Sequence, residues 1–226
     1  MGIRGVLFDL DNTLVNREAS LAVLASELEA VYSADLEAVD EDVVFEVLRA
    51  ADGGGYTPRA AVFLQVIEAL PWRHRPAPED LAEFWASTFP RCTQPAAGVY
   101  EVLDRLKEEG IRMGIVTNGS ETSQHAKVDR VDLRFYMETV VVSEGVGMRK
   151  PDLEIFNLAL ADLGLAAPDV CFVGDHPVND VDGARRAGLA SVWVAGHHPW
   201  PADLDPPAFQ IGGLEAVIPV LKRMQG

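Results

Sequence analysis

Short apolar runs recur along the chain, and polar residues able to take part in chemistry follow several of them. The runs cover residues 5–8, 113–116, 139–142, 170–173 and 191–194. Their length and their content of Val, Ile and Phe are typical of buried β-strands. Helical patterns over 99–108, 154–163 and 181–187 lie between the later runs, and a glycine stands one or two positions beyond each pattern. Strands that alternate with helices predict an α/β fold with a parallel sheet.

The segment 15–93 interrupts this alternation. Helix-like patterns cover 18–31, 35–51, 60–70 and 79–87, with a Gly-rich turn and a Pro-rich stretch between some of them. We therefore expect a core domain formed by 1–14 and 94–226, and a helical domain inserted at 15–93. Ligands bind at the carboxyl ends of parallel strands, so an insertion after the first strand is expected to act as a cap over that site. A helical subdomain without a gating role is the alternative.

Charge and composition narrow the classes of function. The 226 residues include 19 Lys and Arg against 35 Asp and Glu, a formal net charge of −16. This charge repels phosphate backbones and anionic lipid, so nucleic-acid polymers and membranes are not expected as partners. No targeting leader and no apolar stretch of membrane-spanning length are recognisable, which predicts a cytoplasmic protein. The two cysteines lie far apart, and Cys171 within an apolar run is expected to be a buried hydrophobic residue.

Two carboxylates, Asp9 and Asp11, come directly after the first apolar run. Residues i and i+2 of an extended segment point to the same side, so these carboxylates repel one another unless a cation lies near them. A divalent metal is the simplest explanation. The alternative is an Asx turn, in which Asp11, Asn12 and Thr13 end the strand and start a helix.

Four separated motifs extend this first signal. In chain order they are Asp9-Leu10-Asp11-Asn12-Thr13, Thr117-Asn118-Gly119, Lys150-Pro151, and Gly174-Asp175 through Asn179-Asp180. Each motif alone is an ordinary turn or helix start. Their combination resembles the haloacid dehalogenase-like superfamily of hydrolases over almost the whole chain, specifically the phosphatases with a helical C1 cap. The resemblance implies a Rossmann-like α/β core of parallel strands with an inserted helical cap domain.

The resemblance also implies a mechanism. Asp9 is the implied nucleophile, whose carboxylate attacks phosphorus to give an aspartyl-phosphate. Asp11 is the implied general acid for the leaving group and later the general base that activates water. Lys150 offsets the negative charge of Asp9 and the phosphoryl group. Mg²⁺ is the implied metal, bound by the carboxylates of Asp9 and Asp175 and by the backbone carbonyl of Asp11.

Other motif residues have supporting roles by the same resemblance. The Thr117 hydroxyl and the Asn118 backbone amide are expected to hold phosphoryl oxygens, and Gly119 permits a close turn. Thr13 is expected to orient the nucleophile loop through a hydrogen bond. Asp180 is expected to orient a metal-bound water or Lys150.

Three alternatives to a phosphatase of a small phosphorylated metabolite remain open. A 2-haloacid dehalogenase is disfavoured by Asp11, because halide leaves without protonation. A sugar-phosphate mutase shares all four motifs. A non-catalytic regulatory protein that binds metal or phosphate would be expected to lack one of the catalytic acids. His176 is expected either to touch phosphate or to pack, whereas the adjacent His197 and His198 are not expected to share a metal. Monomer and homodimer are both open.

Overall fold

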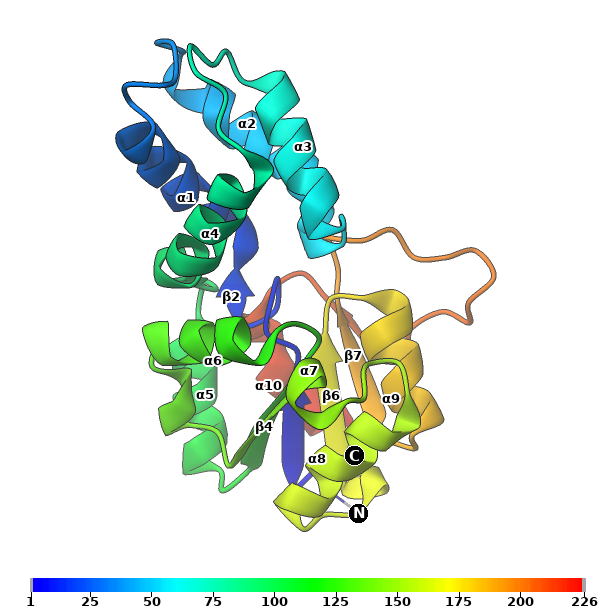
Figure 1. Cartoon of the computed structure of the whole chain (residues 1–226). Helices are drawn as coiled ribbons and strands as arrows, with labels where there is room; N and C mark the ends of the chain where they lie inside the picture. The colour runs from blue at the N-terminus through cyan, green and yellow to red at the C-terminus, as the bar shows by residue number, and fades with distance from the viewer. Residues whose placement is uncertain (1, 225–226) are drawn as a thin grey trace. The chain divides into compact units, whose positions relative to one another are not determined.

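A computed structural model of the protein describes residues 2–224 (Figure 1). The chain divides into two compact units, one formed by the residues up to Asn16 together with those from Pro95 onward, the other by Arg17–Gln94. The chain crosses between the units at two short strands, β2 (Val15–Asn16) and β3 (Gln94–Pro95). Among the helices of residues 2–224, none has the length and apolar character needed to cross a lipid bilayer.

The first unit is built on a six-stranded sheet with the strand order β5-β4-β1-β6-β7-β8. Its strands are β1 (Gly5–Phe8), β4 (Arg112–Thr117), β5 (Thr139–Val142), β6 (Val170–Gly174), β7 (Ala190–Val194) and β8 (Gln210–Ile211). Neighbouring strands pair in parallel throughout, and Phe8 of β1 lies opposite Ile115 of β4 and Val173 of β6. The expected Rossmann-like α/β core is therefore confirmed.

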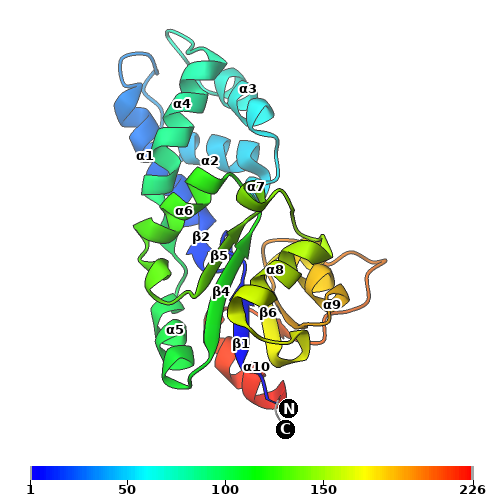
Figure 2. The same ribbon diagram turned by 60° about the horizontal axis from the view of Figure 1, so that its bottom comes forward.

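Helices cover both faces of this sheet (Figure 2). They are α5 (Val99–Glu108), α6 (Glu121–Arg130), α7 (Ser143–Val146), α8 (Leu153–Leu163), α9 (Gly183–Arg186) and α10 (Val217–Met224). Alternate side chains of a strand point to opposite faces. Accordingly Val6 and Phe8 join a buried cluster with α5 and α10, whereas Leu7 joins a second cluster with α8. The central strand is thus buried on both faces.

The second unit consists of α1 (Arg17–Val31), α2 (Glu41–Asp52), α3 (Arg59–Ala69) and α4 (Pro78–Thr88), with short 3₁₀ turns at Gly53–Gly55 and Phe89–Cys92. One buried apolar cluster draws side chains from all four helices. These helices share their own core, which explains why the unit is compact by itself.

The helix expected over 35–51 is wrong at its beginning, because α2 starts only at Glu41. Residues 35–37 pair with 71–73 instead: Leu36 bridges Trp72, the Glu37 amide donates to the Pro71 carbonyl at 2.9 Å, and the Arg73 amide donates to the Asp35 carbonyl at 2.7 Å. Backbone groups engaged in this pairing are not available for helical hydrogen bonds. The helix expected over 181–187 is also divided, into a π-helical turn η5 (Pro177–Asp182) and α9.

Candidate active site

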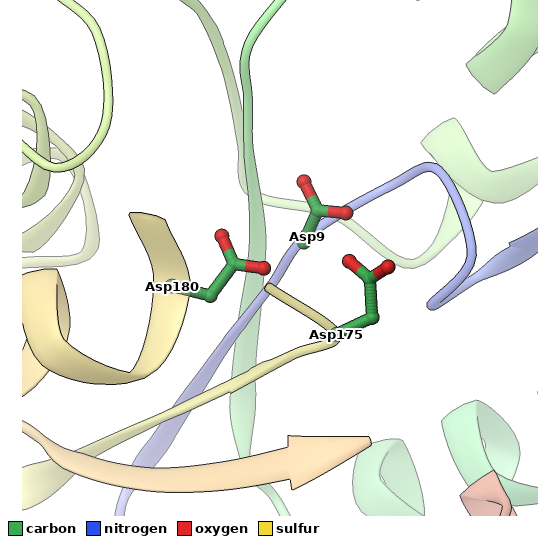
Figure 3. Close-up of side chains that lie close together, drawn as sticks. All are labelled: Asp9, Asp175 and Asp180. Carbon is green, nitrogen blue, oxygen red and sulfur yellow. The ribbon is translucent and has the colours of Figure 1, made fainter. Parts of the chain in front are cut away.

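Three carboxylates converge at the carboxyl end of the central strands: Asp9, Asp175 and Asp180 (Figure 3). Asp9 follows β1, Asp175 follows the neighbouring strand β6, and Asp180 lies in the turn η5. One oxygen atom of each carboxylate lies within 4.8 Å of the others, and all three side chains are buried. Residues 166 positions apart in the sequence, Asp9 and Asp175, thus meet at the edge that the strand pattern predicted.

Lys150 places a cation among these carboxylates. Its Nζ donates to Asp9 Oδ1 at 2.6 Å and lies 2.7 Å from Asp180 Oδ1. Burial lowers the pKa of Lys150, but the carboxylates of Asp180 and Asp9 outweigh burial and raise the pKa above its ordinary value. The lysine is therefore an ammonium ion in this site. Asp180 is also fixed by the backbone amide of His176, which donates to its Oδ2 at 2.9 Å.

Three carboxyl groups share this site with one ammonium group. Burial, together with Asp180 and Asp11, raises the pKa of Asp9 to about 7 against the influence of Lys150. Burial and the charges of Asp9 and Asp180 raise the pKa of Asp175 to about 9. The Oδ2 atom of Asp175 is buried and accepts no hydrogen bond from residues 2–224, and His198 Nε2 approaches it only to 3.5 Å. A buried carboxylate oxygen that accepts no hydrogen bond is suited to coordinate a metal cation.

Asn118 ties the end of β4 to the segment that carries Lys150. Its side-chain Nδ2 donates to the Lys150 carbonyl, and its Oδ1 accepts from the Lys150 amide, both at 2.9 Å. The Gly119 amide donates to Ser143 Oγ at 3.0 Å. The Asn118 side chain therefore has a positioning role that the sequence did not indicate, in addition to the backbone role predicted for this residue.

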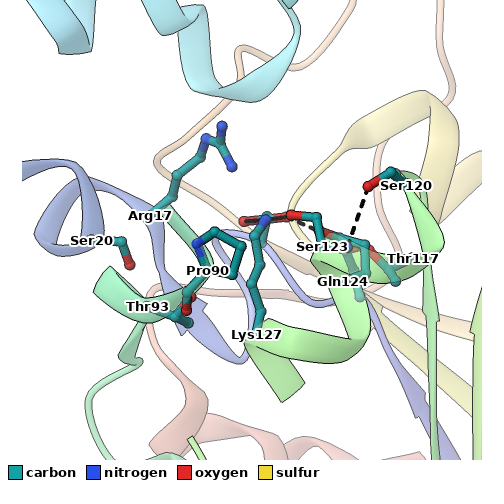
Figure 4. Close-up of polar contacts among 12 residues, drawn as sticks. Arg17, Ser20, Pro90, Thr93, Thr117, Ser120, Ser123, Gln124 and Lys127 are labelled. Atoms are coloured by element: carbon teal, nitrogen blue, oxygen red, sulfur yellow. Dashed lines mark hydrogen bonds and ion pairs between the residues drawn. The ribbon is translucent and has the colours of Figure 1, made fainter. Parts of the chain in front are cut away.

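A second cation, which no motif of the sequence indicates, lies at Asp11. Lys127 Nζ donates to both carboxylate oxygens of Asp11, at 2.9 and 2.7 Å. Gln124 Nε2 donates to Asp11 Oδ2 at 3.1 Å and to Thr117 Oγ1 at 2.6 Å. Both residues come from α6 and are buried (Figure 4). The sequence contains only a weak indication that Gln124 and Lys127 belong to the site: they are two polar residues, one turn apart, in a helix that begins just after Thr117-Asn118-Gly119.

The Asp9–Thr13 loop leaves β1 as a tight turn, in which the amides of Thr13, Leu14 and Val15 all approach the Leu10 carbonyl. Asn12 adopts a left-handed conformation with φ 60°. This turn is made by backbone hydrogen bonds and leads into β2, so it differs from the Asx turn and helix start considered as the alternative. The Thr13 hydroxyl is buried but makes no hydrogen bond within the described chain, so the orienting bond expected of it is absent there.

His176 and His198 lie beside Asp175 with their ring centroids 4.8 Å apart. His176 Nδ1 accepts from the amides of Val178 and Asn179 at 3.2 and 3.1 Å, so this ring caps the turn η5. Burial lowers the pKa of both histidines. Trp193 Nε1 donates to the Asp175 carbonyl at 2.8 Å and fixes the backbone at this carboxylate. A packing and capping role for His176, one of the two expected, is therefore observed.

Comparison with known proteins identifies the family. The sequence profile of the haloacid dehalogenase-like hydrolases matches residues 6–194, which include all four motifs. The chain belongs to the haloacid dehalogenase-like hydrolases. The hydrolase is 34% identical over 199 residues to the ribulose-1,5-bisphosphate 5-phosphatase of Halopiger xanaduensis, covering 83% of this chain and 82% of the relative. It is 29% identical over 194 residues to the glyceraldehyde 3-phosphate phosphatase of Pyrococcus abyssi, covering 84% and 81% of the two chains.

A solved structure shows the same fold. The HAD-hydrolase YfnB of Bacillus subtilis, solved with magnesium bound, superposes on this hydrolase with a TM-score of 0.74 at 22% identity, covering 98% of this chain and 99% of YfnB. Hydrolases of this family typically use a divalent metal, and the cluster of Asp9, Asp175 and Asp180 offers oxygen ligands suited to one. Lys150 pairs with Asp9 and Lys127 pairs with Asp11, so each lysine offsets the charge of a different carboxylate of the Asp9–Thr13 loop.

Proposed function

We propose that this hydrolase is a Mg²⁺-dependent phosphatase that hydrolyses a small phosphate monoester through an aspartyl-phosphate on Asp9. The observation that carries the proposal is the buried cluster of Asp9, Asp175 and Asp180 around Lys150. That the chain is a phosphatase of its family rests on relatives named as phosphatases in several organisms. The substrates for which these relatives are named are small phosphorylated metabolites, which supports a substrate of the same class here.

In the first step, a carboxylate oxygen of Asp9 forms a bond to phosphorus while the bond from phosphorus to the ester oxygen breaks. Lys150 holds Oδ1 of Asp9, so we assign the attack to Oδ2. Asp11 gives its proton to the departing alkoxide. In the second step Asp11 takes a proton from water, the water oxygen bonds to phosphorus, and the bond to Asp9 breaks to release inorganic phosphate.

The residues present fit a magnesium ion. Asp9 and Asp175 would hold it through their carboxylates and Asp11 through its backbone carbonyl, and the unbonded Oδ2 of Asp175 supports this assignment. When bound, Mg²⁺ neutralises negative charge on the phosphoryl oxygens. Thr117 and the Asn118 amide would hold the same oxygens. Asp180, already bonded to the His176 amide, would keep Lys150 directed at Asp9.

We also propose that the helical unit, Arg17–Gln94, is the cap domain of this enzyme. A compact helical unit inserted directly after the first strand and its loop supports this assignment. A cytoplasmic location and the absence of nucleic-acid and membrane partners stay predictions from charge and sequence. The oligomeric state stays open between monomer and homodimer.

The test is phosphate release from p-nitrophenyl phosphate and a panel of sugar and nucleotide monophosphates, with and without Mg²⁺. Wild type is compared with Asp9→Asn and with Asp203→Asn, an exposed carboxylate that serves as the matched control. We expect Mg²⁺-dependent release that Asp9→Asn lowers by at least about a thousandfold, because the nucleophile is lost. Asp203→Asn should keep wild-type turnover.

Normal turnover by Asp9→Asn would contradict the proposed mechanism. Absence of phosphate release from every substrate would contradict the phosphatase itself. Halide release from a 2-haloacid and isomer formation from a sugar phosphate would then be measured, because a dehalogenase and a mutase are the alternatives within the same superfamily.

A further inference from the structure

Asp11 is held from two sides by residues of one helix. Lys127 Nζ donates to both of its carboxylate oxygens, and Gln124 Nε2 donates to Oδ2. Lys127 and Gln124 are both buried. A buried ammonium is costly unless it is paired, and the two short bonds to Asp11 provide that pairing. An ammonium that donates to both oxygens is the hydrogen-bonding pattern of an ionised carboxylate, which accepts on either oxygen.

The same glutamine links Asp11 to the end of β4. Its Nε2 donates to Thr117 Oγ1 at 2.6 Å as well as to Asp11 Oδ2 at 3.1 Å. An amide nitrogen carries two hydrogens, so both bonds can form at once. Thr117 and Asp11, which belong to different motifs, are therefore kept in a fixed relation by one side chain.

The placement of α6 makes this arrangement rigid. Gln124 and Lys127 stand three positions apart and so share one face of the helix. Ser120 caps the helix, since its hydroxyl accepts from the Ser123 amide at 3.3 Å (Figure 4). A Cβ atom at Gly119 would lie 2.8 Å from Gln124 Cγ, so the glycine leaves the space that the glutamine occupies.

We propose that Lys127 and Gln124 are positioning residues that hold the Asp11 carboxylate as the base for hydrolysis of the aspartyl-phosphate. The inference rests on the proposed function, because it assigns the residues a role in its second step. In that step Asp11 must accept a proton from water, and a fixed carboxylate is directed for this transfer. In the first step a proton on one Asp11 oxygen would replace one of the two bonds from Lys127.

The two steps can be separated with p-nitrophenyl phosphate. Nitrophenolate leaves without protonation, so kcat/KM reports formation of the aspartyl-phosphate with little need for Asp11. Hydrolysis of the aspartyl-phosphate limits kcat once it becomes slow. A residue that acts through Asp11 in the second step therefore lowers kcat while kcat/KM is retained, whereas general damage to the site lowers both.

The experiment measures steady-state rates and the pre-steady-state release of nitrophenolate for the full chain with Mg²⁺. For Lys127→Met we expect kcat to fall by about 10-fold or more, a part of the roughly 10²–10⁴-fold that general-base catalysis contributes. KM should fall with it, and a burst of nitrophenolate should approach one equivalent of enzyme. Lys127→Arg, which keeps a cation able to donate to both carboxylate oxygens, should retain more of kcat than Lys127→Met.

Two further variants complete the design. Gln124→Leu removes the second hydrogen-bond donor to Asp11 and leaves Lys127 intact. It should also lower kcat, but by less than Lys127→Met does. If Lys127→Met does not fold, the inference is tested with Gln124→Leu. Lys222→Met is the matched control: this exposed lysine of α10 lies 3.5 Å from Glu109 Oε1, and its loss should change neither constant.

Equal losses of kcat and kcat/KM, or no loss in Lys127→Met and Gln124→Leu, would overturn the inference. If the proposed function itself is wrong, the wild-type protein will release no nitrophenolate, which distinguishes this result from failure of the inference about Lys127 and Gln124. A wild type that turns over, together with unchanged kcat in the folded variants, would reject only the role of α6.

Discussion

At the scale of single residues, Gly174 shows how closely the site is packed. This last residue of β6 lies against Asp180: an added Cβ would stand 2.5 Å from Asp180 Oδ2 and 2.6 Å from its Cγ. The carboxylate of Asp180 in turn lies 2.7 Å from Lys150 Nζ. A methyl group added at Gly174 would therefore displace the Asp180 carboxylate relative to Lys150.

We expect Gly174→Ala to lower the free energy of unfolding by about 1–3 kcal/mol, because overpacking forces side chains or backbone to shift. Phosphatase activity should fall as well, since Asp180 must move relative to Lys150. Urea unfolding and rates of phosphate release test both effects. The control is Gly212→Ala, where an added Cβ meets nothing within 4 Å. Unchanged stability and activity in Gly174→Ala would show that Asp180 is not fixed in this position.

At the scale of elements, one buried carboxylate joins three helices of the second unit. Asp52, at the end of α2, accepts from Arg17 of α1 at 2.7 and 2.6 Å and from Arg59 of α3 at 2.9 Å. The guanidinium of Arg17 lies over the Phe89 ring, and that of Arg59 over the Trp85 ring of α4. Polar contacts thus fix the helix ends while the apolar cluster fills the interior.

We expect Asp52→Asn to lower the free energy of unfolding by about 3–5 kcal/mol, because it leaves the buried Arg17 without its counter-charge. Urea unfolding at neutral pH measures this loss. Glu46→Gln is the matched control on the same helix. Glu46 forms an exposed pair with Arg49, and exposed pairs contribute little to stability. Equal effects of the two substitutions would contradict the structural role of Asp52.

The same carboxylate predicts a pH dependence. Burial raises the pKa of Asp52, but hydrogen bonds and charge from Arg17 and Arg59 outweigh burial and hold the pKa below its ordinary value of 3.8. Because the pKa of Asp52 is lower in the folded state, the ionised carboxylate stabilises the folded protein at pH values above 3.8. This stabilisation is lost as the pH falls through the pKa that Asp52 has in the folded state. Below pH 3.8 the unfolding free energy of wild type should therefore fall more steeply than that of Asp52→Asn, as measured by urea unfolding over a pH series.

At the scale of the whole molecule, the net charge of −16 attracts cations, and the carboxylate cluster is the site that we propose for one of them. Asp9 and Asp180 pair with Lys150, and Asp175 lies in the same cluster, so the mutual repulsion of the three carboxylates opposes folding in the absence of a further cation. If Mg²⁺ binds the folded state and not the unfolded state, mass action raises the free energy of unfolding as the Mg²⁺ concentration rises.

We expect Mg²⁺ at 100 times its dissociation constant to raise the free energy of unfolding by about 2.7 kcal/mol. Asp175→Asn should remove most of this increase, because it takes away one proposed ligand. Asp203→Asn should keep it. Thermal unfolding with Mg²⁺ and with chelator measures the shift in Tm. A shift of the same size in Asp175→Asn and wild type would place the ion elsewhere.

The sequence by itself determined the strands of the core and the residues at their ends. Burial of β1, β4, β5, β6 and β7 in a parallel sheet follows from local apolar runs, and the runs end where the structure has the strand ends, within one residue. Because carboxyl ends of parallel strands share one edge, Asp9, Thr117 and Asp175 had to approach one another. The i, i+2 spacing singled out Asp11 together with Asp9, and the motifs then identified Asn118, Gly119, Lys150 and Asp180 by resemblance.

Only the tertiary structure decided which side chains hold those residues. Lys127 and Asp11 are 116 positions apart, and no periodicity or motif of α6 indicates that they pair. The pairing of 35–37 with 71–73, which shortens α2, also joins distant segments. Hydrophobic periodicity reports local burial, whereas an ion pair or a backbone bridge between distant segments depends on where the folded chain brings them. The sequence therefore supplied the chemistry of the candidate site, and the fold supplied the contacts that orient it.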